Sequence, residues 1–171
     1  MLPRVYIRPP VDNDWAALLE MHRRSADFHQ PWATPALDDR GCKRYINRCQ
    51  TEPFVGMLIW HAVDHQLVGV ANLSQIFYGS FQNAYLGYYG SVDYTRQGLM
   101  TEGIALVIHH AFTTLQLHRI EANIQPANSA SINLIKRLGF ANEGFSRQYL
   151  KVNGKWRDHE RWALTIDRWQ P

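Results

Sequence analysis

The chain has 171 residues, of which 46 % are hydrophobic and 19 % are charged, and its formal net charge is +3. This length and composition predict one globular domain over residues 1–171 with its own hydrophobic core. The mild positive charge permits an anionic ligand, but it lies below the basic excess that is typical of nucleic-acid-binding proteins. The segment MLPRVYIRPP holds no apolar run of signal-peptide or membrane-spanning length, so we expect a soluble, cytoplasmic protein with no membrane partner.

The N-terminal half of the chain reads as a strand, a helix opened by an Asp/Asn cap, a proline-broken loop, a second helix and three strands. These elements are expected, in that order, at residues 4–9, 12–24, 28–35, 37–50, 54–62, 67–78 and 84–92. The last three strands follow one another at close spacing, which suggests an antiparallel meander.

The C-terminal half begins with the clearest helix pattern. Its apolar residues recur at helical spacing: Ile104, Val107, Ile108, Ala111, Phe112 and Leu115. A strand at 118–126 follows, so the strands on either side of this helix form a crossover and should be parallel.

A shorter helix follows this strand, with Asn128 as its expected N-cap and Gly139 just past its end. Two final strands, 141–152 and 155–166, are joined at Asn-Gly, the signal of a type I′ hairpin. The expected fold class is therefore α+β, with a mixed sheet that is antiparallel except at one crossover.

The metal-binding residue types form no defensible site. Cys42 and Cys49 both fall in a helix-like segment and lack the CxxC spacing of a structural zinc site, so we expect reduced thiols. His109 and His110 are adjacent on a helix and therefore point in different directions. We expect no metal.

The segment YTRQGLMTE, Tyr94 to Glu102, lies between an expected strand and the long helix. Amide groups at a helix N-terminus are unpaired and carry partial positive charge, so this segment could bind an anion. Gly98 would let the backbone approach the anion closely, and Arg96 would add positive charge. The segment is neither a Walker A loop nor a dinucleotide-binding GxGxxG. An ordinary strand-to-helix turn explains the local string equally well.

Ser131 shares one face of the shorter helix with Leu134, Ile135 and Leu138. This face packs inward, so the Ser131 hydroxyl would point into a cleft, where it can donate a proton. Judged by position alone, a small residue at a helix–sheet contact is the more common explanation.

Together these pieces resemble the GCN5-related N-acetyltransferases (GNAT), most of all the RimJ/RimL-type ribosomal-protein N-terminal acetyltransferases. The resemblance runs over nearly the whole chain, and the segments that carry it are QPW (30–32), AYLGY (84–88), QGLMTE (97–102), HRIEANIQPANSAS (118–131), LGFANEG (138–144) and NGKWRDH (153–159). It implies a mixed, mostly antiparallel sheet with helices on both faces and a V-shaped splay between the two parallel central strands.

The cofactor that the resemblance implies is acetyl-CoA, as co-substrate. Its pyrophosphate would lie on the amides of the phosphate loop and its pantetheine arm between the splayed strands. The implied contact residues are Tyr88, Tyr89, Gly90, Thr95, Arg96, Gln97, Gly98, Leu99, Met100, Thr101 and Asn128. Thr95 and Met100 depart from the family motif, which has Gln/Arg and Gly/Ala there.

The implied reaction is direct attack of a neutral amine on the thioester. Ser131 matches the serine that protonates the departing thiolate, and Asn128 matches the asparagine beside the pantetheine arm. The acidic residue that acts as base in the family falls near Leu150, whose side chain cannot accept a proton. Asp158 and His159 are therefore the candidate bases, acting through a water molecule. The candidate acceptor-binding residues are Trp32, Tyr149, Trp156 and Asp158. The three aromatic residues could equally be core residues, and Asp158 could equally be a polar residue at a strand edge.

The expected function is transfer of acetyl to a protein N-terminal α-amine, with a ribosomal-protein-like acceptor. One alternative is a small-molecule amine acetyltransferase acting on a polyamine or drug-like amine, which the basic charge disfavours weakly. Another is a non-catalytic acyl-CoA or RNA-binding module, because KVNGKWRDHERW mixes basic and aromatic residues. RNA contact is at most incidental in our reading, and monomer and homodimer both stay open.

Overall fold

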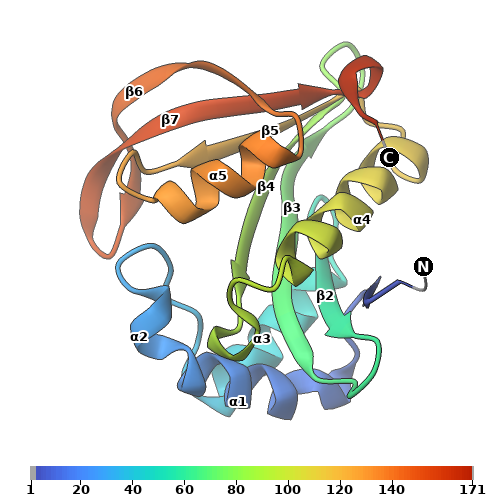
Figure 1. The fold of residues 1–171 in the computed structure, drawn as a ribbon, viewed down its shortest axis with the longest axis vertical. Helices are drawn as coiled ribbons and strands as arrows, with labels where there is room; N and C mark the ends of the chain where they lie inside the picture. Colours follow the sequence, from blue (N-terminus) through green and yellow to red (C-terminus); the bar gives the residue numbers. More distant parts are fainter. Residues whose placement is uncertain (1–2, 171) are drawn as a thin grey trace.

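The computed structural model describes residues 3–170 and contains a seven-stranded sheet in the order β1-β2-β3-β4-β5-β7-β6 (Figure 1). Its strands are β1 (Val5–Arg8), β2 (Val55–His61), β3 (Leu67–Phe77), β4 (Asn83–Gly90), β5 (Arg119–Ile124), β6 (Ala141–Val152) and β7 (Lys155–Thr165). The α-helices are α1 (Trp15–Arg24), α2 (Ala26–His29), α3 (Asp39–Cys49), α4 (Leu99–Thr113) and α5 (Ser129–Arg137). Short 3-10 turns are η1 (Asp12–Asp14), η2 (Val92–Tyr94) and η3 (Ile166–Arg168).

The parallel pair β4–β5 is the centre of the sheet, and its short pairing confirms the expected splay. Among the described residues, every other neighbouring pair of strands is antiparallel. β4 and β5 pair over only three residue pairs, which end at Tyr85 and Glu121. Beyond that point residues 86–90 of β4 and 122–124 of β5 separate (Figure 1). Their facing backbone groups are therefore left for another partner.

Helices cover both faces of the sheet, as expected. Met57 and Ile59 of β2 belong to a buried cluster that also holds the inner face of α4 and Ile135 of α5. Their neighbours Leu58 and Trp60 point the other way, into a second cluster with residues of α1 and α3. This alternation follows from the two-residue period of a strand. Within residues 3–170, no helix has both the length and the hydrophobicity needed to cross a bilayer.

The turn signals of the C-terminal half are confirmed. The Asn128 side chain caps α5 by accepting a bond from the Ser131 amide at 3.2 Å. Gly139 follows the helix with a positive φ of 85°. Asn153 and Gly154 both have positive φ, 51° and 75°, which is the geometry of a type I′ turn.

Two predictions near the N-terminus were wrong. The segment expected as a single capped helix is divided into η1 and α1, and the Asp14 carboxylate does not cap α1. It accepts instead from the Val11 amide at 2.7 Å and from Arg8 at 2.6 Å, because a guanidinium on the adjacent strand is the stronger partner. The expected loop at 28–35 overlaps α2, which extends to His29.

Candidate active site

A cleft of about 950 Å³ opens where β4 and β5 separate. Its walls come from the end of β4, the loop into α4, the end of β5, the start of α5 and the segment after α2. It brings together twelve of the residues predicted from the sequence: Trp32, Tyr88, Tyr89, Gly90, Thr95, Arg96, Gly98, Met100, Thr101, Asn128, Ser131 and His159.

Two predicted cofactor contacts, Gln97 and Leu99, do not line the cleft. The Leu99 side chain is buried in the core, and the Gln97 side chain folds back to donate to the Asp93 carbonyl at 3.3 Å. These two residues could therefore bind an anion only through their backbone amides.

The predicted acceptor residues on the β6–β7 hairpin also lie outside the cleft lining. They are Tyr149, Trp156 and Asp158. Trp156 is 58 % exposed, so it is not a core residue, and Asp158 accepts a hydrogen bond from the Gln148 amide at 2.8 Å. Their acceptor-binding role stays a prediction.

The loop into α4 has the geometry of an anion-binding helix start. Gly98 is the N-cap of α4 and adopts a left-handed conformation, with φ of 79°. The first amide bonded back into the helix is that of Glu102, to the Gly98 carbonyl. The preceding helical amides, residues 99–101, therefore have no partner within the helix and carry partial positive charge. The Thr95 amide is used in a long 3.5 Å bond to the Val92 carbonyl.

Met100, which departs from the family motif, has a packing explanation. Its side chain lies against Gly69 of β3 and Gly90 of β4, where a Cβ atom at Gly69 would overlap the Met100 sulfur. The two glycines thus make room for a large residue at this position. The Met100 side chain is therefore accommodated by packing against these glycines of β3 and β4.

The cleft favours negatively charged ligands. Within residues 3–170, its lining includes no Asp or Glu, whereas Arg96 and Arg137 both contribute. Arg137 lies in the last turn of α5 and was missed from the sequence, because nothing local distinguishes it from a solvated arginine. Asn123 of β5 also lines the cleft, and its buried Oδ1 has no hydrogen-bond partner among the described residues. A buried polar atom of this kind normally has a partner, so a bound ligand is a natural one.

Ser131 and Tyr88 form a hydroxyl pair on one wall of the cleft. The Ser131 Oγ and the Tyr88 hydroxyl are 2.6 Å apart, and the Tyr88 hydroxyl is also 3.3 Å from the Ser131 carbonyl oxygen. Burial raises the pKa of Tyr88 to about 12, so its phenol stays protonated at neutral pH. The pair can therefore hold and donate a proton. The Tyr88 hydroxyl was missed because nothing near Tyr88 in the sequence indicates α5 as its partner.

Two buried histidines, His29 and His159, also line the cleft. His159 Nδ1 is 2.9 Å from the Arg157 carbonyl oxygen, so in the neutral ring Nδ1 is the donor and Nε2 is left as an acceptor. His29 Nε2 donates to the Gly90 carbonyl at 2.8 Å, and burial lowers the pKa of His29. His29 was missed because its strand partner is distant in the sequence.

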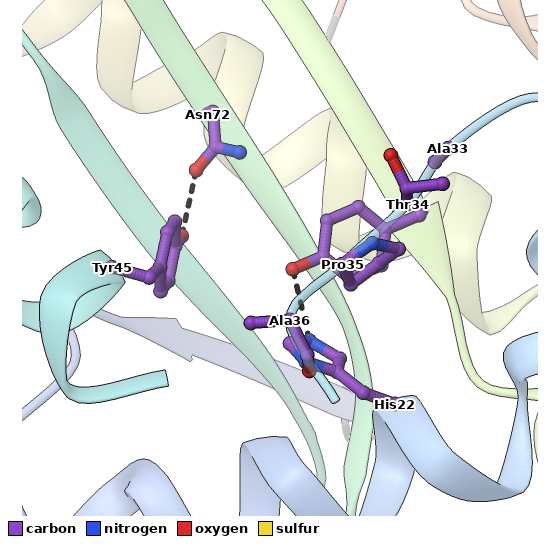
Figure 2. A pocket seen from close by; sticks show the side chains of 8 residues that line it. His22, Ala33, Thr34, Pro35, Ala36, Tyr45 and Asn72 are labelled. Carbon is purple, nitrogen blue, oxygen red and sulfur yellow. Dashed lines mark hydrogen bonds between the residues drawn. The ribbon is translucent and has the colours of Figure 1, made fainter. Parts of the chain in front are cut away.

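A smaller side pocket of about 250 Å³ lies between β3, β4 and the segment before α3. Figure 2 shows the side chains that line it: His22, Ala33, Thr34, Pro35, Ala36, Tyr45, Asn72 and Tyr89. The Tyr45 hydroxyl donates to Asn72 Oδ1 at 2.7 Å, and the Tyr89 hydroxyl lies 3.0 Å from His22 Nε2. Burial raises the pKa of both phenols and lowers that of His22, so all three are neutral at pH 7.

The cysteines contribute no chemistry to either space. Cys42 and Cys49 are free thiols, as expected, and burial raises the pKa of each. In the part of the chain that the structure describes, no group of three or more His, Cys, Asp or Glu side chains is placed to hold a metal ion.

The fold and the site define an acetyltransferase. A family model described as "Acetyltransferase (GNAT) domain" matches residues 4–141. The chain therefore belongs to the GNAT acetyltransferase family and is an N-acetyltransferase, a class that uses acetyl-CoA as the acetyl donor.

Individual relatives fall in the same class. A probable N-acetyltransferase of Bacillus subtilis, YjcK, is 32 % identical over 94 % of this chain and 93 % of its own. The ribosomal protein uS5-alanine N-acetyltransferase of Escherichia coli is 33 % identical over 98 % of this chain and 91 % of its own. The structure of Mycobacterium smegmatis RimJ in complex with a CoA disulfide is similar, with a TM-score of 0.88 and 28 % identity over 95 % of this chain and 82 % of that one.

Proposed function

We propose that this N-acetyltransferase is a single domain that modifies the N-terminal α-amine of a protein. The acceptor is a ribosomal protein or a protein like one. The observation that carries the proposal is the charge of the cleft, whose described lining has two arginines and no carboxylate. Such a lining suits an anionic acetyl donor and an acceptor that bears no more than the charge of one amine. The similarity to the uS5-alanine N-acetyltransferase supports the same choice.

The residues at the splay fit acetyl-CoA, which supplies the acetyl group as a thioester. Its pyrophosphate would bind the unpaired amides at the start of α4, with Arg96 beside them and Arg137 across the cleft. Its pantetheine amides would pair with the unpaired edge of β4 at 88–90 and with the Asn123 side chain. The Asn128 side-chain nitrogen is left for the same arm, because its oxygen caps α5.

Ser131 is the proposed proton donor to the departing thiolate. Its hydroxyl faces the cleft and has Tyr88, a protonated phenol, directly behind it. Donation by Ser131 can thus be followed by proton transfer from Tyr88, and the Tyr88 phenolate, with a pKa of about 12, then takes a proton from solvent in the cleft. The capping bond that the Ser131 amide donates to Asn128 Oδ1 holds this residue at the helix start.

His159 is the proposed proton acceptor from the amine. An α-amine has a pKa of about 7.7–8.0, so a useful fraction is already neutral at pH 7 and a weak base is sufficient. In the neutral His159 ring, the bond from Nδ1 to the Arg157 carbonyl leaves Nε2 as the acceptor. Asp158, the other candidate from the sequence, lies outside the described cleft lining, and its Oδ1 accepts a backbone bond.

A thermal-shift and thiol-release experiment tests this function. Acetyl-CoA should raise the melting temperature, because a ligand that binds the folded state stabilises it. Release of CoA thiol should then be faster with alanine- or serine-starting peptides than with spermidine. If acetyl-CoA binds but spermidine is the better acceptor, the small-molecule alternative is correct and the proposal is wrong.

A further inference from the structure

The side pocket adjoins the cleft. Ala33, Asn72 and Tyr89 line both spaces. A water molecule occupies roughly 30 Å³ in the liquid, so a pocket of about 250 Å³ can hold a group of several heavy atoms. Its described lining has no charged side chain that could hold a second ammonium group, because His22 is neutral. The pocket therefore suits a small, uncharged part of an acceptor.

A bare position of β4 lies beside Asn72, a residue that lines both spaces. Asn72 of β3 lies directly across from Gly87 of β4, and a Cβ atom at Gly87 would meet nothing within 4 Å. Gly87 itself lines the cleft. Asn72 and Gly87 belong to the same sheet face as Tyr89, whereas Tyr88 points to the opposite face, toward α5. A group can therefore pass from the cleft over Gly87 to Asn72.

The hydrogen bonds of the pocket leave one amide donor unused. The Asn72 oxygen accepts from Tyr45, which turns its nitrogen away from that residue (Figure 2). His22 Nδ1 donates to the Ala36 carbonyl at 2.8 Å and its Nε2 accepts from Tyr89. Among the described residues, the Asn72 side-chain nitrogen has no hydrogen-bond partner, although it borders the pocket and the cleft.

We propose that Asn72 selects the acceptor by donating a hydrogen bond from Nδ2 to the first carbonyl oxygen of a peptide N-terminus. The first side chain of the acceptor then lies in the pocket, beside Tyr45 and Tyr89. This inference rests on the proposed function, since a peptide N-terminus carries a carbonyl two bonds from its amine nitrogen and an alkylamine or polyamine does not. Tyr45 is a positioning residue, because its hydroxyl fixes which end of the Asn72 amide faces the acceptor.

Substitution of Asn72 by Asp is the direct test. Asn72→Asp keeps an acceptor for the Tyr45 hydroxyl and removes the donor, with almost no change of shape. The kcat/KM for an alanine-starting peptide should fall about tenfold or more, while that for a primary alkylamine of matched length should not fall. Asn133→Asp, at an exposed position of α5 outside the cleft lining, adds the same charge and should leave both values unchanged.

A second variant keeps the test decisive if Asn72→Asp folds poorly. Gly87→Val places a side chain in the open passage, in a strand that tolerates a β-branched residue. It should reduce peptide turnover by about tenfold or more, whereas the thermal shift with acetyl-CoA should be retained. Unchanged peptide turnover in folded Asn72→Asp, or an equal loss for peptide and alkylamine, overturns the inference, as does unchanged turnover in Gly87→Val. If the unsubstituted protein acetylates no peptide, the proposed function itself has failed.

Discussion

The Tyr88 hydroxyl and the Ser131 Oγ lie 2.6 Å apart, and this contact joins the central strand β4 to the start of α5. The two residues are 43 positions apart in the chain. Tyr88 lies three positions beyond Tyr85, the last β4 residue that pairs with β5, so the contact lies within the splayed region. The hydroxyl pair is thus placed at the gap that would hold the reacting thioester.

Ser131→Ala should lower kcat by about a hundredfold, because a positioned proton donor is lost from the transition state. Tyr88→Phe should cost less, about tenfold, because Ser131 keeps its own proton. Steady-state and single-turnover kinetics measure both, and the affinity for acetyl-CoA should stay the same. Ser129→Ala, at an exposed position of the same helix turn, is the matched control. Unchanged single-turnover rates in Ser131→Ala would exclude the serine as donor.

Gly98→Ala should weaken acetyl-CoA binding, because an alanine at φ of 79° costs about 1–2 kcal/mol and distorts the first amides of α4. Gly79→Ala provides the control, since Gly79 also has a positive φ of 69° but lies in the turn between β3 and β4, outside the cleft lining. Both variants should lose melting temperature. Only Gly98→Ala should also lose the thermal shift that acetyl-CoA produces, and an equal shift in the two variants would count against the anion site.

Arg137→Gln should reduce the affinity for acetyl-CoA by about fivefold at low salt, as expected for one partly exposed ionic contact. The difference from the unsubstituted protein should shrink as salt is added, because exposed charges are screened. Calorimetric titration at two salt concentrations measures this. Arg147→Gln changes the same charge on exposed β6, outside the cleft lining, and should bind like the unsubstituted protein. A salt-independent loss would contradict an ionic role for Arg137.

Met100→Ala should destabilise the fold by about 1–3 kcal/mol, because it empties the space that Gly69 and Gly90 provide for the side chain. Affinity for acetyl-CoA should remain if the amides of the loop do the binding, as proposed. Urea unfolding and calorimetry measure the two effects separately. A large loss of affinity without loss of stability would mean that the Met100 side chain contacts the cofactor.

The stability of the protein should decrease as the pH falls from 7 to 5. Burial lowers the pKa of His22 and of His29, so below about pH 6.5 the unfolded chain binds more protons than the folded one and is favoured. The lowered pKa of Asp14, which Arg8 and the Val11 amide hold ionised, matters only in more acidic solution, below about pH 4.

Urea unfolding at pH 7 and pH 5 checks this dependence. The free energy of unfolding should change less with pH in His22→Gln, which keeps a donor for the Ala36 carbonyl and an acceptor for Tyr89. His65→Gln, at an exposed position, should follow the unsubstituted protein. An undiminished pH dependence in His22→Gln would mean that folding does not lower the pKa of His22.

The fold was largely predictable because its signals are local. The apolar period of α4, the cap at Asn128 and the Asn-Gly turn each act within a few residues, and each is present in the structure. The one capping prediction that failed is the Asp/Asn cap of a helix over 12–24, because residues 12–14 form η1 and the carboxylate that precedes α1, that of Asp14, is held by Arg8 on a neighbouring strand. Tertiary contacts of this kind leave no local pattern.

The site was predictable only in part, for the same reason. Gly98 and Ser131 lie in motifs that resemble a known family, and both line the cleft. Asn72, Arg137 and the Tyr88 hydroxyl gain their meaning from neighbours distant in sequence, so the sequence alone could not indicate them. Trp156 and Tyr149 were chosen for their aromatic character, which says nothing about the direction in which a strand presents them.

Consecutive tyrosines on β4 divide the two halves of the proposed reaction between the two sides of the sheet. Tyr88 contacts Ser131 on the α5 side, and Tyr89 contacts His22 on the α1 side. Substitutions on the α1 and α3 side can therefore alter acceptor choice during evolution while the proton donor on the other side is retained. A one-residue insertion before Tyr88 would exchange the two tyrosines between the sides and disable both functions at once.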